Sequence, residues 1–385
     1  MAFDTPDCGF IFWPVGTGDS TTIVINDETF MQVDLRHMAK SEGDDDPAYP
    51  VVDELEKILP TINNTPYLST FVLTHPDLDH IQGFSDLLER VTIGELWFTP
   101  RIFREYKKDL CDDAIAFKEE AERRLKAVID NNGNVESGDR IRIIGYDDLL
   151  EEDEFSGLPD NLLTIPGNFV TNIDGVNVDT DFSAFIHAPF KPEEDEERND
   201  TSLGMQVTVI GNKSSASALL LGDLKYSSIR KIIDASKQNG NQNELQWNIL
   251  LAPHHCSKSV MFVKNEDTEE YEYQSDIMED LEESALDPGY IISSSMPVPD
   301  SNEQGDNPPH AIAKEKYELI APNDFICTHE NPEEDTNPVV FDVECTDLIP
   351  TDDDTASEAK GLGAAIESAR GQSEPPSSKA GFGSK

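Results

Sequence analysis

The sequence predicts an α/β fold, because short apolar segments typical of buried strands alternate with longer segments of helical spacing. Residues 21–25 and 29–35 are rich in β-branched side chains and flank a turn signal, which predicts a β-hairpin near the start of the chain. Residues 71–73 form a short apolar strand, and residues 81–90 follow with the spacing of a helix. This alternation of strand, loop and helix is typical of α/β proteins.

The other elements follow from the same two periodicities. Helical spacing at residues 51–59 ends at Pro60, and the charged segment 102–129 carries an apolar stripe that predicts one or two helices outside a sheet. The acidic segments 147–155 and 193–200 are predicted to be loops, and residues 259–285 an insertion. Further strands are expected at residues 10–13, 93–98, 141–144, 179–188, 204–210, 218–221, 249–251, 290–293 and 324–328.

The composition limits the function and the cellular location. A formal net charge of -48 argues against non-specific nucleic-acid binding through a basic surface, although a locally positive or metal-filled cleft remains compatible with it. The five cysteines are scattered and form no CxxC pair, which favours a reducing compartment over a disulfide framework or zinc ribbon. The sequence has no run of 18 apolar residues and no basic segment typical of a secretory signal at its start. We therefore expect a cytoplasmic protein without membrane contact.

The chain is expected to form one large domain over residues 1–350, interrupted by acidic insertions, followed by a tail over residues 351–385. The tail is rich in Asp, Ser, Gly, Ala and Lys and lacks the apolar content needed to fold alone. It is therefore predicted to be disordered.

The most informative motif directly follows the strand at residues 71–73. The segment Thr74-His75-Pro76-Asp77-Leu78-Asp79-His80 places two histidines and two aspartates within six residues. A strand that ends in a short, ligand-rich loop can direct several side chains at one point. Two imidazoles and two carboxylates in this spacing suit a pair of metal ions that share one site.

Two other predicted strands also end at residues of ligand type. Asp223 follows the apolar run 219–221 and Gly222, and the pair His254-His255 follows the strand at 249–251. Alone, a Gly-Asp pair after a strand is usually a turn, and a histidine pair can be a partly buried loop. Three such strand ends in one chain favour a common metal site, in which Asp223 has the position of a bridging carboxylate.

In their order along the chain, these and neighbouring motifs resemble the metallo-β-lactamase domain of ComEC-type competence proteins. The resemblance is carried by the following motifs: Val15-Gly16-Thr17-Gly18-Asp19-Ser20, Val33-Asp34, Thr74-His75-Pro76-Asp77-Leu78-Asp79-His80-Ile81-Gln82-Gly83, Asn199-Asp200-Thr201-Ser202-Leu203, Leu221-Gly222-Asp223, Ala252-Pro253-His254-His255-Cys256-Ser257-Lys258-Ser259 and Pro309-His310. We call residues 74–80 the first metal loop. The resemblance extends over residues 9 to 345. The chain departs from the pattern in Cys256, which replaces a glycine, in its acidic insertions, and in the absence of the ComEC membrane channel.

The resemblance implies an αββα sandwich, two mixed β-sheets covered by helices, with the metals at one edge. It implies His75 and Asp77 as ligands of the first metal, Asp79 and His80 of the second, and Asp223 between them. One of His254 and His255 would complete a site, and the sequence does not select which. The third histidine of the first site has no clear counterpart, and His187 is the nearest candidate.

The ligand set favours two divalent cations, Mn²⁺ or Zn²⁺, with Mg²⁺ as an alternative, because oxygen ligands favour harder ions. Asp79 is a candidate for orienting the attacking water. Lys258 is a candidate for neutralising a phosphate, and His310 for protonating a leaving oxygen. Asp34 and Asp19 are predicted to orient the histidine ligands rather than to bind metal.

The leading hypothesis is a metal-dependent phosphodiesterase or nuclease that acts on DNA, RNA or a nucleotide. One alternative is an enzyme for another ester, such as a phosphocholine ester, a lactone or a thioester. A second alternative is a degenerate, metal-stabilised binding module that contacts a protein partner through its acidic surface or tail. The strong acidity weighs against long polyanionic substrates at low salt, since charges of like sign slow encounter.

Overall fold

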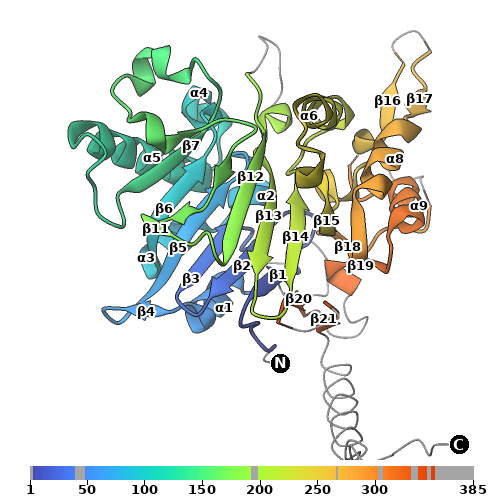
Figure 1. Cartoon of the computed structure of the whole chain (residues 1–385), viewed down its shortest axis with the longest axis horizontal. Helices are drawn as coiled ribbons and strands as arrows, with labels where there is room; N and C mark the ends of the chain where they lie inside the picture. The colour runs from blue at the N-terminus through green and yellow to red at the C-terminus, as the bar shows by residue number, and fades with distance from the viewer. Residues whose placement is uncertain are drawn as a thin grey trace, which may run out of the picture.

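A computed structural model describes residues 3–39, 48–191, 198–265, 268–301, 307–330, 337–344 and 348–351. The predicted tail lies outside the described residues except for Thr351, as do Cys345 and the acidic residues 193–197. The described part contains two large mixed sheets, which Figure 1 shows packed face to face with helices on their outer sides.

The first sheet has ten strands in the order β21-β20-β1-β2-β3-β5-β6-β7-β8, with β4 paired to β5. The strands β1 to β3 pair antiparallel, whereas β3, β5, β6, β7 and β8 are parallel neighbours. The strand bounds are β1 Gly9–Phe12, β2 Thr21–Asn26, β3 Thr29–Val33, β4 Thr61–Ile62, β5 Thr65–Leu73, β6 Thr92–Phe98, β7 Arg140–Ile144, β8 Leu163–Thr164, β20 Val339–Asp342 and β21 Pro350–Thr351.

The second sheet has seven strands in the order β19-β18-β15-β14-β13-β12-β9. Its strands are antiparallel from β9 to β14 and parallel from β14 to β19. The bounds are β9 Phe169–Val170, β12 Phe182–Ala188, β13 Gly204–Ile210, β14 Ser215–Leu220, β15 Trp247–Leu251, β18 Ala285–Ser293 and β19 Asp324–Cys327. Two small hairpins are formed by β10 Asn172–Ile173 with β11 Val176–Asn177, and by β16 Phe262–Lys264 with β17 Tyr271–Tyr273.

Three apolar layers hold the sandwich together. One layer lies between the first sheet and the helices α1, α3, α4 and α5, a second between the two sheets, and a third between the second sheet and α6, α8 and α9. The helix bounds are α1 Val51–Ile58, α2 Leu78–Ile81, α3 Phe84–Arg90, α4 Arg101–Arg104, α5 Asp112–Asp130, α6 Tyr226–Asn239, α7 Pro253–Cys256, α8 Ser275–Glu283 and α9 Ala311–Ile320. The predicted αββα sandwich is confirmed.

The central segments of several strands are largely apolar because both of their faces are buried. In β1, Phe10 and Phe12 pack between the sheets, while Ile11 packs toward the helices. In β14, Ala218 and Leu220 face the first sheet, while Leu219 packs against α6. Continuous burial on both faces removes the polar alternation that a half-exposed strand would show.

Several elements differ from the prediction. The helix expected over residues 81–90 is divided into α2 and α3, because Gly83 adopts a φ of +94° between them. The segment 102–129 forms α4, a short 3-10 turn η1 (Lys107–Asp109) and α5. The acidic insertion after residue 259 contains the hairpin β16–β17 and helix α8, and the acidic segment 147–155 contains two 3-10 turns. No helix of the described residues is long and apolar enough to span a membrane.

Replacement of Phe117 by alanine should destabilise the fold strongly. The Phe117 ring lies 5.0 to 6.0 Å from the rings of Phe71, Phe84 and Phe98, and it is fully buried between α5 and the first sheet. A cavity at such a site typically costs about 3–5 kcal/mol. Urea unfolding should show this loss for Phe117→Ala and almost none for Lys126→Ala on the exposed side of α5. Equal stability of the two variants would contradict this assignment of the core.

Candidate metal centre

The first metal loop begins where β5 leaves the sheet. Thr74 is anchored to Asp34, which follows the parallel neighbour β3: its backbone N–H donates to Asp34 Oδ1 over 2.8 Å and its hydroxyl to Oδ2 over 2.6 Å. The chain then turns through Asp77 into the single-turn helix α2, which carries Asp79 and His80. Parallel pairing of β3 with β5 therefore places Asp34 directly beside the loop.

Asp223 reaches the same point from the second sheet. It follows β14 through Gly222, which has a φ of +51°; a Cβ atom there would lie 3.1 Å from the Ser202 side chain and 3.4 Å from that of Thr74. The backbone of Leu203 donates to Thr74 O, which ties the two sheets together beside the site. Gly222 thus allows the close approach that brings the buried Asp223 to the first metal loop.

His254 and His255 lie in a strained turn after β15. Their φ angles are +52° and +53°, and that of Cys256 is +64°. Three consecutive residues other than glycine in the left-handed region are unfavourable by roughly 1–2 kcal/mol each. The turn brings both adjacent imidazoles to Asp223. Strain of this kind is typical of functional sites.

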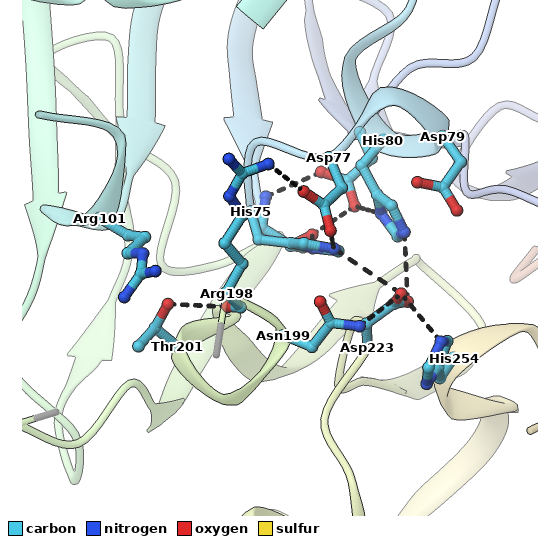
Figure 2. Close-up of polar contacts among 12 residues, drawn as sticks. His75, Asp77, Asp79, His80, Arg101, Arg198, Asn199, Thr201, Asp223 and His254 are labelled. Atoms are coloured by element: carbon cyan, nitrogen blue, oxygen red, sulfur yellow. Dashed lines mark hydrogen bonds and ion pairs between the residues drawn. The ribbon is translucent and has the colours of Figure 1, made fainter. Parts of the chain in front are cut away.

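Four imidazole Nε2 atoms converge on the Asp223 carboxylate, and Figure 2 shows those of His75, His80 and His254. Asp223 Oδ2 lies 3.7 Å from His75 Nε2 and 3.6 Å from His254 Nε2. Asp223 Oδ1 lies 3.2 Å from His80 Nε2 and 3.4 Å from His255 Nε2. The carboxylate therefore divides the site into two halves, with two histidines on each oxygen.

Each half also contains an aspartate from the first metal loop. Asp77 Oδ2 lies 3.7 Å from His75 Nε2, and Asp79 Oδ2 lies 3.3 Å from His255 Nε2. We call the group of His75, Asp77, His254 and Asp223 Oδ2 the His75 half. We call the group of His80, Asp79, His255 and Asp223 Oδ1 the His80 half. The structure thus brings together all seven residues that the sequence offered as metal ligands.

The outer nitrogen of each histidine contacts an oxygen behind it. His80 Nδ1 lies 2.7 Å from Asp34 Oδ2, and His255 Nδ1 lies 3.3 Å from Asp19 Oδ1. The contact of Asp34 agrees with its predicted orienting role, whereas Asp19 also belongs to a group of four side chains that could hold a metal ion. In the other half, the Nδ1 atoms of the two histidines lie 3.1 Å from Thr74 Oγ1 and 3.3 Å from Ser259 Oγ. Such contacts fix the ring orientation and turn Nε2 toward the centre.

The electrostatics of the His80 half place positive charge around Asp223. Burial opposes charge on both of its histidines, but neighbouring carboxylates raise the pKa of His80 well above its ordinary value and that of His255 to about 10. Burial would raise the pKa of Asp223, but His255 and His80 hold it well below its usual range. When bound, divalent cations would supply positive charge beside the same carboxylates.

The donor set fits divalent metal ions. One donor atom from each of Asp19, His80, Asp223 and His255 lies within 4.8 Å of the other three. His75 Nε2 is fully buried, points into the centre, and has no hydrogen-bond partner among the residues that the structure describes. Buried polar atoms are rarely left unpaired. Imidazole and carboxylate donors together suit Zn²⁺ and Mn²⁺ better than Mg²⁺, which prefers an all-oxygen set.

The two adjacent histidines lie beside different oxygens of Asp223. Both contact Asp223, and His254 stands where the His75 half needed another nitrogen donor. His187 lies elsewhere: its Nε2 donates to Glu244 O over 2.7 Å, its ring packs on Phe185, and burial lowers its pKa to about 4. The expectation that His187 completes the first site is therefore wrong, because the side chain points to the outer side of the second sheet.

Lys258 and His310 lie next to the His254-His255 turn rather than in the cluster. The Lys258 ammonium lies 4.6 Å from the centre of the Tyr271 ring. His310 Nδ1 accepts a hydrogen bond from the Lys258 backbone N–H, and the backbone N–H of His310 donates to Cys256 O. His310 therefore supports the turn. The Cys256 thiol is buried in the apolar layer beneath α9, where it fills space.

Arg198 is a site residue that the sequence reasoning missed. Its guanidinium donates to Asp77 Oδ1 over 2.8 Å and lies 2.9 Å from Glu105 Oε2 (Figure 2 shows the Asp77 contact). The next residue, Asn199, reaches Asp223 Oδ2 over 3.4 Å. A lone arginine between an acidic run and the Asn-x-x-Ser-Leu segment was the available signal.

Comparisons with known proteins find a likeness among solved structures. No protein-family model and no curated protein sequence matches the chain. Among solved structures, the chain is similar to a class B3 di-zinc metallo-β-lactamase, LRA-12, from an Alaskan soil metagenome. The likeness covers 73% of this chain and 90% of that chain, with 11% identity and a TM-score of 0.33.

Replacing Asp34 by asparagine should weaken metal binding without unfolding the chain. Asparagine tolerates the φ of +53° at this position, but its neutral amide is a poorer partner for His80 Nδ1 than a carboxylate. Loss of an outer-shell carboxylate typically lowers metal affinity about 10- to 100-fold. Chelator competition should show this loss for Asp34→Asn and none for Asp139→Asn on the surface. Unchanged affinity in Asp34→Asn would contradict the orienting role.

Proposed function

We propose that the protein is a metal-dependent hydrolase, and most specifically a phosphodiesterase or nuclease that uses two divalent cations. The observation that carries the proposal is the convergence of four Nε2 atoms on the two oxygens of Asp223. A carboxylate shared between two histidine pairs suits the bridging position of a two-metal site. The ComEC-like order of sequence motifs supports a phosphodiester as the bond that is cleaved.

His75, His254 and Asp77 would hold one cation, His80, His255 and Asp79 the other, and Asp223 would contact both. When bound, two such cations lower the pKa of a water ligand and polarise the phosphoryl oxygen. The contribution of the chain is to fix these donors in advance. Thr74, Ser259, Asp34 and Asp19 already hold the four imidazole rings from behind, so little rearrangement is required.

Exposure defines the side from which a substrate would approach. The side chains of His75, His80, His255 and Asp223 are almost completely buried. By contrast, Asp77, Asp79 and His254 keep 30%, 34% and 20% of their side-chain surface exposed. A substrate would therefore enter past these three residues, and Asp79 has the position to orient a water on that side.

The charge of the chain limits how the substrate reaches the site. At -48, the protein as a whole repels a polyanion at low salt, and this repulsion is screened as the ionic strength rises. Arg198 supplies positive charge beside Asp77, and Lys258 follows the His254-His255 turn. A protein partner that binds the acidic surface would be a further way to bring nucleic acid to the site.

A hydrolysis assay with the double variant Asp79→Ala, His80→Ala tests the proposal. The parent chain, supplied with Mn²⁺ or Zn²⁺, should cleave single-stranded DNA, RNA or a chromogenic phosphodiester. The variant removes two donors of the His80 half, so its rate should fall by more than the roughly 10- to 100-fold typical of outer-shell changes. The surface variant Asp130→Ala should retain full activity.

The folded state of the double variant should be checked by circular dichroism. Retained cleavage in the folded variant would contradict the proposal. If the parent chain binds two metals but cleaves no phosphodiester, another ester becomes the better substrate class. If it binds no metal, a binding module becomes the better assignment.

A further inference from the structure

Exposed tyrosines with lysines against their rings lie on both sides of the metal centre. In hairpin β16–β17, the Tyr271 ring contacts the Lys258 ammonium at 4.6 Å and the Tyr273 ring contacts that of Lys316 at 5.4 Å. These tyrosines keep 47% and 42% of their surface exposed. Single exposed apolar side chains are common on protein surfaces, so the interest of these rings lies in the lysine ammonium beside each of them and in their attachment to the metal site.

The two faces of the hairpin β16–β17 carry different kinds of side chain. Phe262 pairs with Tyr273 and Lys264 pairs with Tyr271, so these four side chains share one face of the two-stranded ribbon. Val263 pairs with Glu272, and these side chains lie on the opposite face. One face therefore carries the aromatic rings and Lys264, whose ammonium pairs with Glu269 over 2.6 Å, and Glu272 lies on the opposite face.

This aromatic face is attached to the metal site through a short segment. Lys258 comes three residues after His255, and the adjacent Ser259 contacts His254 Nδ1. The strand β16 begins at Phe262, directly after this turn. The residues that hold His254 and those that contact Tyr271 thus belong to one continuous stretch.

A third exposed tyrosine lies on the other side of the site. Tyr106 is 73% exposed, and the Lys108 ammonium lies 5.6 Å from the centre of its ring. It follows Glu105, and Arg198 connects this segment to Asp77 by contacts with both Glu105 and Asp77. In Figure 1, α4, which precedes this segment, and the hairpin β16–β17 lie at the upper edge of the molecule, on either side of α2.

An aromatic ring beside an ammonium group suits an unpaired base and its phosphate. Base stacking on aromatic side chains is tolerant of sequence, and a nearby cation binds the backbone. A duplex hides the faces of its bases, so these rings would favour single strands. We propose that Tyr106, Tyr271 and Tyr273 stack the bases of a single-stranded nucleic acid whose backbone crosses the metal centre between them. This inference rests on the proposed function in taking a phosphodiester as the substrate.

The proposal implies an unusual dependence on salt. Ordinary nucleic-acid-binding proteins lose affinity steeply as salt rises, because their contacts are mainly ionic. Here stacking provides the attraction, and the net charge of -48 provides a long-range repulsion that salt screens. Affinity for a single strand should therefore stay level or increase between low and physiological ionic strength.

Binding can be measured without catalysis by fluorescence anisotropy in EDTA, with labelled single-stranded DNA, single-stranded RNA and duplex DNA. The variant Tyr271→Ala, Tyr273→Ala and the variant Tyr106→Ala should each lose affinity for single strands by about tenfold or more. Replacement of the same residues by phenylalanine should preserve affinity, because the ring remains. Phe169→Ala serves as a control, since Phe169 is 53% exposed on the remote strand β9.

Equal affinity of the alanine variants and the parent chain would overturn the inference, as would equal affinity for duplex and single strands. A steep loss of affinity with salt would also overturn it, since ionic contacts would then dominate. The comparison between DNA and RNA identifies which polymer is bound. Because EDTA removes the metal, failure of hydrolysis leaves this test intact. Conversely, active hydrolysis with unaffected variants would overturn only the tyrosine assignment.

Discussion

The structure depends on one constraint: a buried carboxylate, Asp223, must be compensated by positive charge. A charge without a partner is very costly in a protein interior. The chain surrounds Asp223 with four Nε2 atoms, and the neighbouring carboxylates raise the pKa of His80 and His255 against the opposing effect of burial. The same arrangement is suited to divalent cations, since two nitrogen donors lie beside each carboxylate oxygen.

The sandwich meets this constraint by bringing strand ends from both sheets to one rim. The parallel neighbours β3 and β5 contribute Asp34 and the first metal loop, while β14 and β15 contribute Asp223 and the histidine turn. This arrangement costs conformational free energy, because the backbone adopts positive φ angles at Asp34, His254 and His255. Packing on both sides of each sheet supplies the stability that holds these conformations.

Much of this arrangement could be predicted from the sequence. The seven candidate metal ligands directly follow predicted strands, and continuous apolar runs identify the buried strands. The sequence did not separate the roles of His254 and His255, because local propensity does not predict a left-handed turn at non-glycine residues. The joining of Arg198 to Asp77 depends on tertiary contact across 121 positions. The break at Gly83 was also missed, because residues 81–90 keep helical spacing through it.

The central claim is that Asp223 bridges two metal ions, each held by one histidine pair. Anomalous diffraction from crystals grown with Zn²⁺ or Mn²⁺ would test it most directly. If Asp223 bridges the two ions, we expect two anomalous peaks about 3.5–4 Å apart. One peak should lie beside His75 and His254 and the other beside His80 and His255. A single peak, or two peaks that do not share Asp223, would contradict the account.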